Sequence, residues 1–237
     1  MKRRMLISGG TGKFAQKIIE KNNTFIISSP ARSEMDVFNY DQVINTIDRY
    51  RPDIFLHAAA LTRPMAKHDH DPSESIRSNI IGTSNVTLAC MTRGVKLVYI
   101  STDYVYPGVD GDYTEDSPLL PFNKYGWSKM GGECAVHLYD NSLILRVCMN
   151  NKPFPHPKAL IDVKKSLIFD DEAAEIVLKL VDETGVINVG GVSRSIYEFA
   201  KEHNSRIEKI SLKEIRDVVL ARDTSMSIDK MLRLLND

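Results

Sequence analysis

Short apolar runs alternate with longer amphipathic stretches along the whole chain. Each apolar run is followed by small or polar residues, as expected of a buried strand. The runs cover residues 5–8, 24–27, 54–57, 95–100, 142–147 and 186–189. The stretches between and after them have helical periodicity at residues 16–20, 39–50, 72–93, 122–138, 171–181, 195–203, 213–220 and 228–235. This alternation predicts an α/β fold, a doubly wound parallel sheet of the Rossmann type.

The pattern also predicts where elements end and how the chain divides. Asn39 is a candidate N-cap, and Gly94 is a candidate C-cap for the long helix before it. Residues 107–121 are rich in Gly, Asp and Pro and predict an irregular loop over the site, and residues 150–157 predict an irregular crossover. We expect a dinucleotide-binding domain at residues 1–148 and a small, partly intertwined substrate-binding region at residues 149–237.

Composition and charge limit the classes of binding partner and the cellular compartment that we expect. The 237 residues carry 31 Lys+Arg and 31 Asp+Glu, so no net field favours nucleic acid or an anionic membrane. The apolar run behind the basic start ends at Gly9, too short for a signal peptide or a membrane span. The cysteines Cys90, Cys134 and Cys148 are far apart and odd in number, which predicts buried free thiols. We therefore expect a cytoplasmic protein.

Histidines could suggest a metal site. His68 and His70 alternate with acids, but they follow one another on a predicted loop, so we expect no metal there. His57 ends a predicted buried strand and is expected to be packed or hydrogen-bonded, not catalytic.

A glycine-rich turn follows the first strand and opens a helix. It reads Gly9-Gly10-Thr11-Gly12-Lys13-Phe14-Ala15, with the spacing G-x-x-G-x-x-A. Gly9 allows the tight turn, Gly12 lets the backbone approach a pyrophosphate, and small Ala15 lets the helix pack on the strand. The helix N-terminus offers free N–H groups to phosphate. This turn predicts a dinucleotide site.

The end of the second strand bears on which dinucleotide is bound. NAD sites usually place an acid there, whereas residues 28–32 contain no acid and one arginine, Arg32. This composition favours the extra phosphate of NADP, and NAD remains possible. After the third strand, Ala58, Ala59 and Ala60 leave room for a ligand at the edge of the sheet.

A tyrosine and a lysine supply candidate chemistry. Tyr125 and Lys129 are four residues apart and lie on one face of a helix. A cation beside a phenol lowers its pKa, so the pair can exchange a proton with a carbonyl or alcohol. Thr102, at the end of the fourth strand, can hydrogen-bond a substrate carbonyl. The glycines at 126, 131 and 132 predict close backbone contact with cofactor or a neighbouring helix.

Together these pieces resemble the extended short-chain dehydrogenase/reductases that act on nucleotide sugars, most closely the dTDP-4-dehydrorhamnose reductases. The resemblance is good over residues 5–148 and weak beyond. Besides the glycine-rich turn, the matching pieces are residues 35–37, 51–53, 57–62, Asn79, 101–106 and 125–129. The segment at residues 150–170 is short for this family, and residues 146–149 also resemble plant-type enzymes that epimerise and then reduce a UDP-4-keto-6-deoxy sugar.

The resemblance implies roles for particular residues. Thr102 would orient the keto oxygen, Tyr125 would be the general acid, and Lys129 would lower its pKa and bind the nicotinamide ribose. Asp103 and Tyr104 would face the sugar. The cofactor site expected from the turn and the resemblance comprises Gly9, Thr11, Gly12, Lys13, Phe14, Arg32, Asp36, Val37, Ala58, Ala59, Ala60, Thr62, Tyr125 and Lys129. Helices at residues 72–93 and 122–138 would pair across a two-fold axis in a homodimer.

The expected function is reduction of a 4-keto-6-deoxy nucleotide sugar, with hydride from NADPH and the proton from Tyr125. An epimerase or epimerase/reductase of the same fold stays open. A 4,6-dehydratase is disfavoured, because Tyr104 stands where such enzymes carry a glutamate. A non-catalytic, dinucleotide-binding regulatory subunit also stays open; the methionine adenosyltransferase beta subunit resembles this family too, and the short segment after residue 149 favours that alternative.

Overall fold

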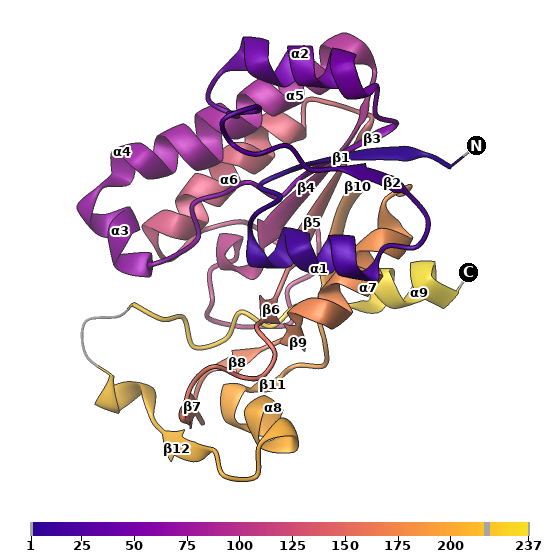
Figure 1. Ribbon diagram of the computed structural model, residues 1–237. Helices are drawn as coiled ribbons and strands as arrows, with labels where there is room; N and C mark the ends of the chain where they lie inside the picture. Colours follow the sequence, from indigo (N-terminus) through magenta and orange to yellow (C-terminus); the bar gives the residue numbers. More distant parts are fainter. Residues whose placement is uncertain (1, 216–218, 237) are drawn as a thin grey trace.

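A six-stranded parallel sheet forms the centre of the protein. The computed structural model describes residues 2–215 and 219–236 (Figure 1). The strands, in the order β10-β5-β4-β3-β1-β2, are Gly185–Val189, Ser142–Val147, Lys96–Thr102, Ile54–His57, Arg4–Ser8 and Ile26–Ser28. All six predicted strands are present and the doubly wound α/β fold is confirmed.

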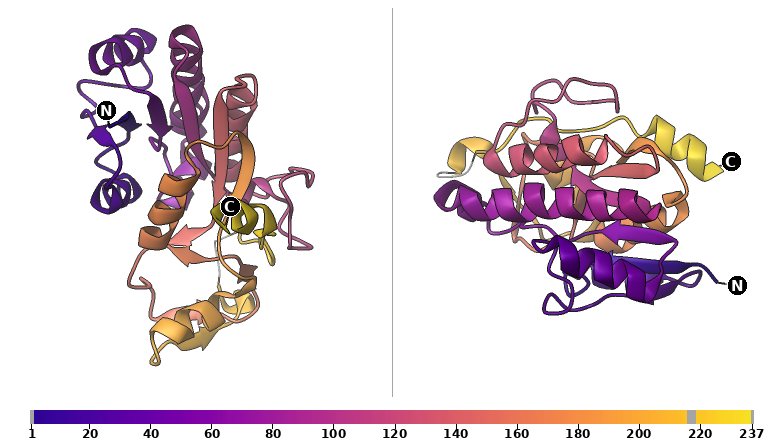
Figure 2. Two further views of the ribbon diagram at one scale, coloured as in Figure 1. Left: turned by 90° about the vertical axis from the view of Figure 1, so that its right-hand side faces the viewer. Right: turned by 90° about the horizontal axis from the view of Figure 1, so that it is seen from above.

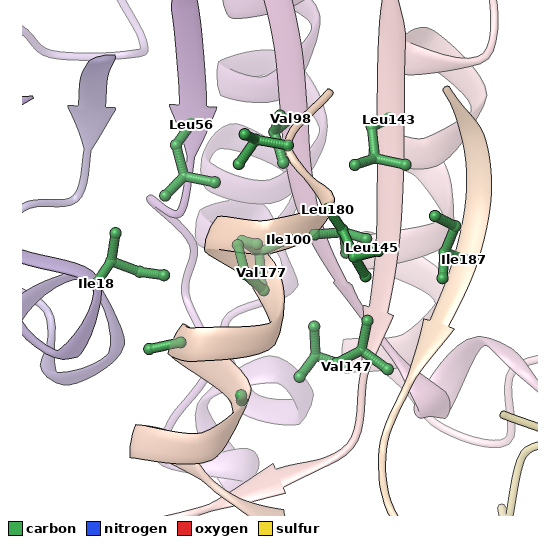
Figure 3. Close-up of a cluster of buried hydrophobic side chains, with 14 of the residues drawn as sticks. Ile18, Leu56, Val98, Ile100, Leu143, Leu145, Val147, Val177, Leu180 and Ile187 are labelled. Atoms are coloured by element: carbon green, nitrogen blue, oxygen red, sulfur yellow. The ribbon is translucent and has the colours of Figure 1, made fainter. Parts of the chain in front are cut away.

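Alternate residues of each strand face opposite sides of the sheet and build two cores. Ile54 and Leu56 belong to one core and Phe55 to the other. Helices α1 (Lys13–Lys21), α7 (Asp170–Leu180) and α9 (Asp229–Asn236) cover the first core, which Figure 3 shows. Helices α2 (Tyr40–Tyr50), α5 (Gly82–Arg93) and α6 (Lys124–Val136) cover the second. Because both faces are covered, the strands are almost continuously apolar.

Most predicted helices are present with shifted ends. The predicted helix at 72–93 is one run made of α4 (Pro72–Ser75), a π-helical stretch η1 (Ile76–Ile81) and α5. Gly94 ends it with φ 66°, and Asn39 caps α2 by accepting from the backbone N–H of Gln42, so both predicted caps are confirmed. Residues 107–121 form the predicted irregular loop, which bridges to the C-terminal part between Tyr113 and Met226.

Two predicted segments are wrong. Residues 68–71 were expected to be a loop, but residues 68–70 belong to the short helix α3 (Met65–His70). The helix expected at 213–220 is only the 3-10 turn η3 (Leu212–Glu214), after which Ile215 is extended. Residues 216–218 of that prediction lie outside the described residues.

The C-terminal part contributes to two places. Its α7, β10 and α9 complete the central layers. The rest forms a small lobe beyond the carboxyl edge of the sheet, at the bottom of Figure 1. The lobe contains α8 (Ile196–His203) and three two-stranded pairs: β6 (Met149–Asn150) with β9 (Ile168–Phe169), β7 (Lys158–Leu160) with β12 (Glu208–Ile210), and β8 (Lys164–Lys165) with β11 (Arg194–Ser195).

The structure also bears on the expected burial of the cysteines and on the expected absence of a membrane span. All three cysteines are free thiols; Cys90 and Cys148 are buried as expected, whereas Cys134 is exposed on α6, so that part of the prediction is wrong. Within residues 2–215 and 219–236, no helix combines the length and apolar character needed to cross a membrane.

Candidate active site

The glycine-rich turn has the backbone geometry that its sequence predicts. Gly9 has φ 72°, and a Cβ there would lie 2.7 Å from the Cα of Ala59. The N–H of Gly12 donates to the carbonyl of Gly9 at 2.8 Å and closes the turn. Helix α1 begins directly afterwards without a side-chain cap, so its first N–H groups are available to an anion.

A cavity of about 250 Å³ lies over this turn and collects most of the expected cofactor residues. Its lining includes Gly9, Thr11, Gly12, Arg32, Asp36, Val37, Ala58, Ala59 and Ala60. Five expected cofactor residues do not line it: Lys13, Phe14, Thr62, Tyr125 and Lys129. Lys13 and Thr62 are exposed, and Phe14 packs against the core under α1. The parallel sheet brings the ends of β1, β2 and β3 together here, as expected of a ligand site in such a fold.

Arg32 and Asp36 lie at the mouth of this cavity. The Arg32 guanidinium donates from Nε to Asp36 at 3.3 Å and stacks over the ring of Phe38, with 4.8 Å between Cζ and the ring centroid. Its side chain is 70% exposed. An exposed guanidinium held over a ring is suited to binding a phosphate.

Helix α6 brings Tyr125 to the carboxyl end of β4. A Cβ on Gly126 would lie 2.2 Å from the carbonyl oxygen of Tyr104, so the absence of a side chain lets the helix approach this closely. Gly131 and Gly132 likewise meet Ile80 and Tyr99, which confirms the predicted close contacts with neighbouring elements. The Tyr125 ring lies 5.7 Å from that of Tyr104, edge to face.

Burial dominates the electrostatics of Tyr125. It raises the pKa of the phenol well above its ordinary value, hydrogen bonding with Thr102 opposes the rise, and the charge of Asp103 adds to it. The expectation that the pKa of Tyr125 is lowered is therefore wrong for the protein alone, because the cost of an ionised phenol in an apolar site outweighs nearby favourable groups.

Lys129 is also buried, one turn along α6. Its Nζ donates to the carbonyl of Ile100 at 2.8 Å and lies 4.2 Å from the ring centroid of Tyr99. Burial lowers the pKa of Lys129 to about 7, and Glu133 opposes this. Both contacts are with β4, so the structure brings Thr102, Tyr125 and Lys129 to one end of that strand.

Asp103, which the resemblance predicts to face the sugar, is buried in a polar cluster. Its side chain is 5% exposed and forms an ion pair with Lys165, while Thr224 donates to the same carboxylate at 2.6 Å. Tyr104 is half-buried beside Tyr125, with the Lys165 ammonium 4.3 Å from its ring centroid. Lys165 and Thr224 were not found from the sequence, because they are 62 and 121 residues away from Asp103.

Buried polar side chains fix the surroundings of Tyr125. Asn79 joins the backbone of Leu61 to the hydroxyl of Ser128, at 2.8 Å from each, and Ser128 donates to the carbonyl of Tyr125. The ring of His68 lies 5.1 Å from that of Tyr125. Asn79 is one of the residues that match the family, but the sequence assigned it no role. The contact of His68 with Tyr125 could not be predicted from the residues around either of them.

Expectations for His57 and for a metal site also follow from the sequence. His57 is buried between Ser8, at 2.7 Å from Nδ1, and Thr83, at 3.0 Å from Nε2, so the prediction of a hydrogen-bonded histidine is confirmed. Burial lowers the pKa of His57 to about 3, which keeps it neutral. Among the described residues, no group of three or more His, Cys, Asp or Glu side chains could hold a metal ion.

A larger cavity, of about 660 Å³, lies in another part of the molecule. Its walls come from the ends of α1 and α8, from β9, and from the first half of α7. Thr102, Tyr125 and Lys129 do not line it. The larger cavity is therefore not the candidate active site, because the reactive side chains lie at the end of β4.

Comparison with known proteins gives consistent matches. The family described as "RmlD substrate binding domain" matches residues 3–149. Methionine adenosyltransferase 2 subunit beta of Bos taurus is 29% identical over 56% of this chain and 42% of its own length. A dTDP-4-dehydrorhamnose reductase of Aggregatibacter actinomycetemcomitans is 30% identical over 60% of this chain and 50% of its own. The chain thus spans about half the length of the curated relatives it matches.

Solved structures extend the likeness to nearly the whole chain. A dTDP-4-dehydrorhamnose reductase of Bacillus anthracis str. Ames, determined in complex with NADP, superimposes with a TM-score of 0.88. The two chains share 28% identity, and the match covers 99% of this chain and 93% of the other. The small C-terminal lobe is therefore part of the shared architecture.

Proposed function

The chain belongs to the RmlD substrate binding domain family, and on that basis we propose that it is an NADPH-dependent reductase of a 4-keto-6-deoxy nucleotide sugar, an extended short-chain dehydrogenase/reductase. The observation that carries the proposal is the meeting of Thr102, Tyr125 and Lys129 at the end of β4. A proton donor, a hydroxyl and a buried amine are the groups that carbonyl reduction requires. Strand β3, which pairs with β4, leads into Ala58, Ala59 and Ala60 of the smaller cavity.

The residues around the smaller cavity fit a dinucleotide. Only a residue without Cβ fits against Ala59 at position 9, and the free N–H groups of α1 suit a pyrophosphate. Arg32 would bind the extra phosphate of NADP, and Asp36 could accept from a ribose hydroxyl, which keeps NAD possible. When bound, the reduced cofactor supplies the hydride.

The proton would come from Tyr125. The phenol is protonated at neutral pH, so it carries the proton that the oxygen of a ketone needs as negative charge develops there, although burial raises its pKa and makes it a weaker acid. Thr102 would orient that oxygen. Lys129, with a pKa of about 7, is partly protonated at neutral pH, and its ammonium would stabilise the phenolate left after donation.

The substrate class follows the named relatives. Two of the similar proteins are dTDP-4-dehydrorhamnose reductases, and a 29% identical relative from Streptomyces niveus is a dTDP-4-keto-6-deoxy-D-glucose reductase. We assign dinucleotide binding to residues 1–148 and sugar-nucleotide binding to the lobe within residues 149–237. Tyr104, half-buried beside Tyr125, would contact the sugar.

Turnover by Tyr125→Phe tests the proposal. The assay is NADPH oxidation with UDP- and dTDP-4-keto-6-deoxyhexoses, alongside fluorescence titration of NADPH binding. The variant keeps the ring and loses the proton donor, so we expect unchanged NADPH binding and a loss of about 10²–10⁴-fold in kcat. Tyr197→Phe, on α8, is the matched control and should keep full activity. Full activity of Tyr125→Phe would contradict the assigned acid.

A non-catalytic, dinucleotide-binding subunit is the second candidate. The similarity to methionine adenosyltransferase 2 subunit beta favours it, since that relative is 29% identical over 143 residues. The two candidates differ in one outcome of the same assay. NADPH binding by the wild type without oxidation by any of the keto sugars would support the regulatory function and exclude the reductase.

We also propose a cytoplasmic homodimer. Helices η1–α5 and α6 lie side by side, as the view from above in Figure 2 shows. They expose large apolar side chains, at 46–53% of their surface: Ile81, Leu88 and Trp127. Apolar side chains of this size on adjacent helices suit burial against a second copy. The three free thiols fit a reducing compartment.

A further inference from the structure

A buried polar cluster joins the end of β4 to the C-terminal lobe. Lys165, from β8, forms an ion pair with Asp103, and the two side chains are 10% and 5% exposed. The Lys165 ammonium also donates to Thr224 at 2.9 Å, and the Thr224 hydroxyl donates to the same carboxylate oxygen at 2.6 Å. Three segments far apart in the sequence thus meet at one carboxylate.

The other oxygen of this carboxylate engages Thr102. The Thr102 hydroxyl donates to Asp103 Oδ1 at 3.2 Å and accepts from the backbone N–H of Tyr104 at 3.3 Å. A threonine hydroxyl has a single proton. While Thr102 donates to Asp103, it therefore cannot donate to the Tyr125 oxygen, the hydrogen bond that opposes the rise in the Tyr125 pKa, or to the oxygen of a ketone.

The charge on Asp103 decides how firmly that proton is held. A hydrogen bond to an ionised carboxylate is roughly twice as strong as a neutral one. Lys165 and Thr224 offset the charge of Asp103, and the Thr102 contact is long for an O–H···O bond. The hydroxyl of Thr102 can therefore turn toward a substrate at small cost.

We propose that Lys165 is a positioning residue of the reductase: by pairing with Asp103, it leaves the Thr102 hydroxyl free to donate to the substrate's keto oxygen. The inference depends on the reductase function proposed above. Lys165 contacts Asp103, Thr224 and the Tyr104 ring, and Thr102 would be the group that touches substrate.

Lys165 also limits the effect of Asp103 on the acid. The Asp103 charge raises the pKa of Tyr125, and an unpaired carboxylate would raise it further. The charged or titratable groups that face Lys165 are Asp103, Tyr104 and Cys148. Burial raises the pKa of the Cys148 thiol, which keeps it neutral, and the pKa of Tyr104 is also raised, so Asp103 is the anion that Lys165 neutralises.

A set of variants separates positioning from simple structural support. Lys165→Met leaves Asp103 charged and unpaired, Asp103→Asn removes the charge, and the double variant removes both. Lys165→Arg keeps a cation. Lys164→Met, at the exposed neighbouring position on β8, is the matched control. Each variant is measured for unfolding by urea, NADPH binding by fluorescence, and kcat and KM for the keto sugar across pH.

The expected pattern is a loss of about 10²-fold in kcat for Lys165→Met, the scale of one lost donor to a developing oxyanion. NADPH binding should stay unchanged, and the pH above which reduction fails should shift upward. Lys165→Arg and the double variant should recover most of kcat, because neither leaves Asp103 charged and unpaired. Lys164→Met should match the wild type.

Lys165→Met with wild-type kcat would overturn the inference while leaving the reductase function intact. Where Lys165→Met does not fold, the double variant decides: folded protein with wild-type-like kcat supports the inference, and folded protein without turnover overturns it. Wild-type protein that oxidises no NADPH with any keto sugar overturns the reductase function itself, and the inference with it.

Discussion

Lys129→Met should stabilise the protein even though it removes a residue of the proposed site. Lys129 is 2% exposed, and burial lowers its pKa from the ordinary 10.5 to about 7. At ~1.4 kcal/mol for each pH unit, this difference is a cost of roughly 5 kcal/mol for burying the ammonium. Methionine is unbranched, apolar and of similar length, so it fills the same space without that cost.

The direction with pH follows from the protons bound. Below about pH 7 the folded and unfolded lysines are both protonated, and the full cost is present. As the pH rises toward 10.5, the folded lysine is neutral while the unfolded one still binds a proton, so the wild type becomes more stable. Methionine lacks this change, but it loses the hydrogen bond to Ile100, which costs ~1–3 kcal/mol. The variant should be more stable by ~2–4 kcal/mol at pH 6 and should lose this advantage near pH 10.

Urea unfolding followed by circular dichroism, without nucleotide, measures this difference at pH 6 and pH 9.5. Lys124→Met is the control, because Lys124 lies on the same helix with its side chain 53% exposed, and its substitution should leave the pH dependence unchanged. A Lys129→Met protein less stable than the wild type at pH 6 would refute the reasoning. So would a difference in stability that is the same at both pH values.

Three further outcomes follow from the contacts described. Arg32→Ala should weaken NADPH binding by about tenfold or more, because a charged hydrogen bond contributes ~1.5–3 kcal/mol, and should leave NADH binding unchanged. Fluorescence titration measures both affinities, and equal losses for the two cofactors would exclude Arg32 as the phosphate ligand. Gly126→Ala should lower the free energy of unfolding by ~1–3 kcal/mol because its Cβ meets the Tyr104 carbonyl at 2.2 Å, and an unchanged urea midpoint would count against that close approach. Leu88→Asp should give a monomer by light scattering where the wild type is a dimer; a variant that remains dimeric would place the interface elsewhere.

The central strands could be predicted because both of their faces are buried. Ile54, Phe55 and Leu56 are all fully buried, so the run is apolar whichever face each residue takes. The short strands of the lobe gave no such signal. Pairs such as β6 with β9 are two residues long, and a period cannot be recognised over two residues.

Some residues of the candidate site could be predicted from their neighbours in sequence, whereas others come from distant segments and could not. Thr102, Tyr125 and the glycine-rich turn are each defined by neighbours in sequence, and the order of strands in the fold explains why they meet. Lys165 and Thr224 reach Asp103 only because the C-terminal lobe packs against the end of β4. The predicted direction of the Tyr125 pKa shift was wrong, because the spacing of Tyr125 and Lys129 indicates a neighbouring cation but does not indicate how deeply the phenol is buried.

The two perturbed groups of α6 decide which of them carries a proton before the proposed reaction begins. Burial raises the pKa of Tyr125 and lowers that of Lys129 to about 7, so slightly above neutral pH the tyrosine carries its proton and the lysine is mostly neutral. A phenol in this state carries a proton but releases it less readily than an exposed tyrosine. Reduction of a ketone needs a donor, whereas oxidation of the alcohol needs the phenolate. For the proposed reduction, Tyr125 therefore holds the required proton, and the same burial that makes Lys129 costly to the fold makes that proton harder to release, so the ammonium form of Lys129 is needed to stabilise the phenolate.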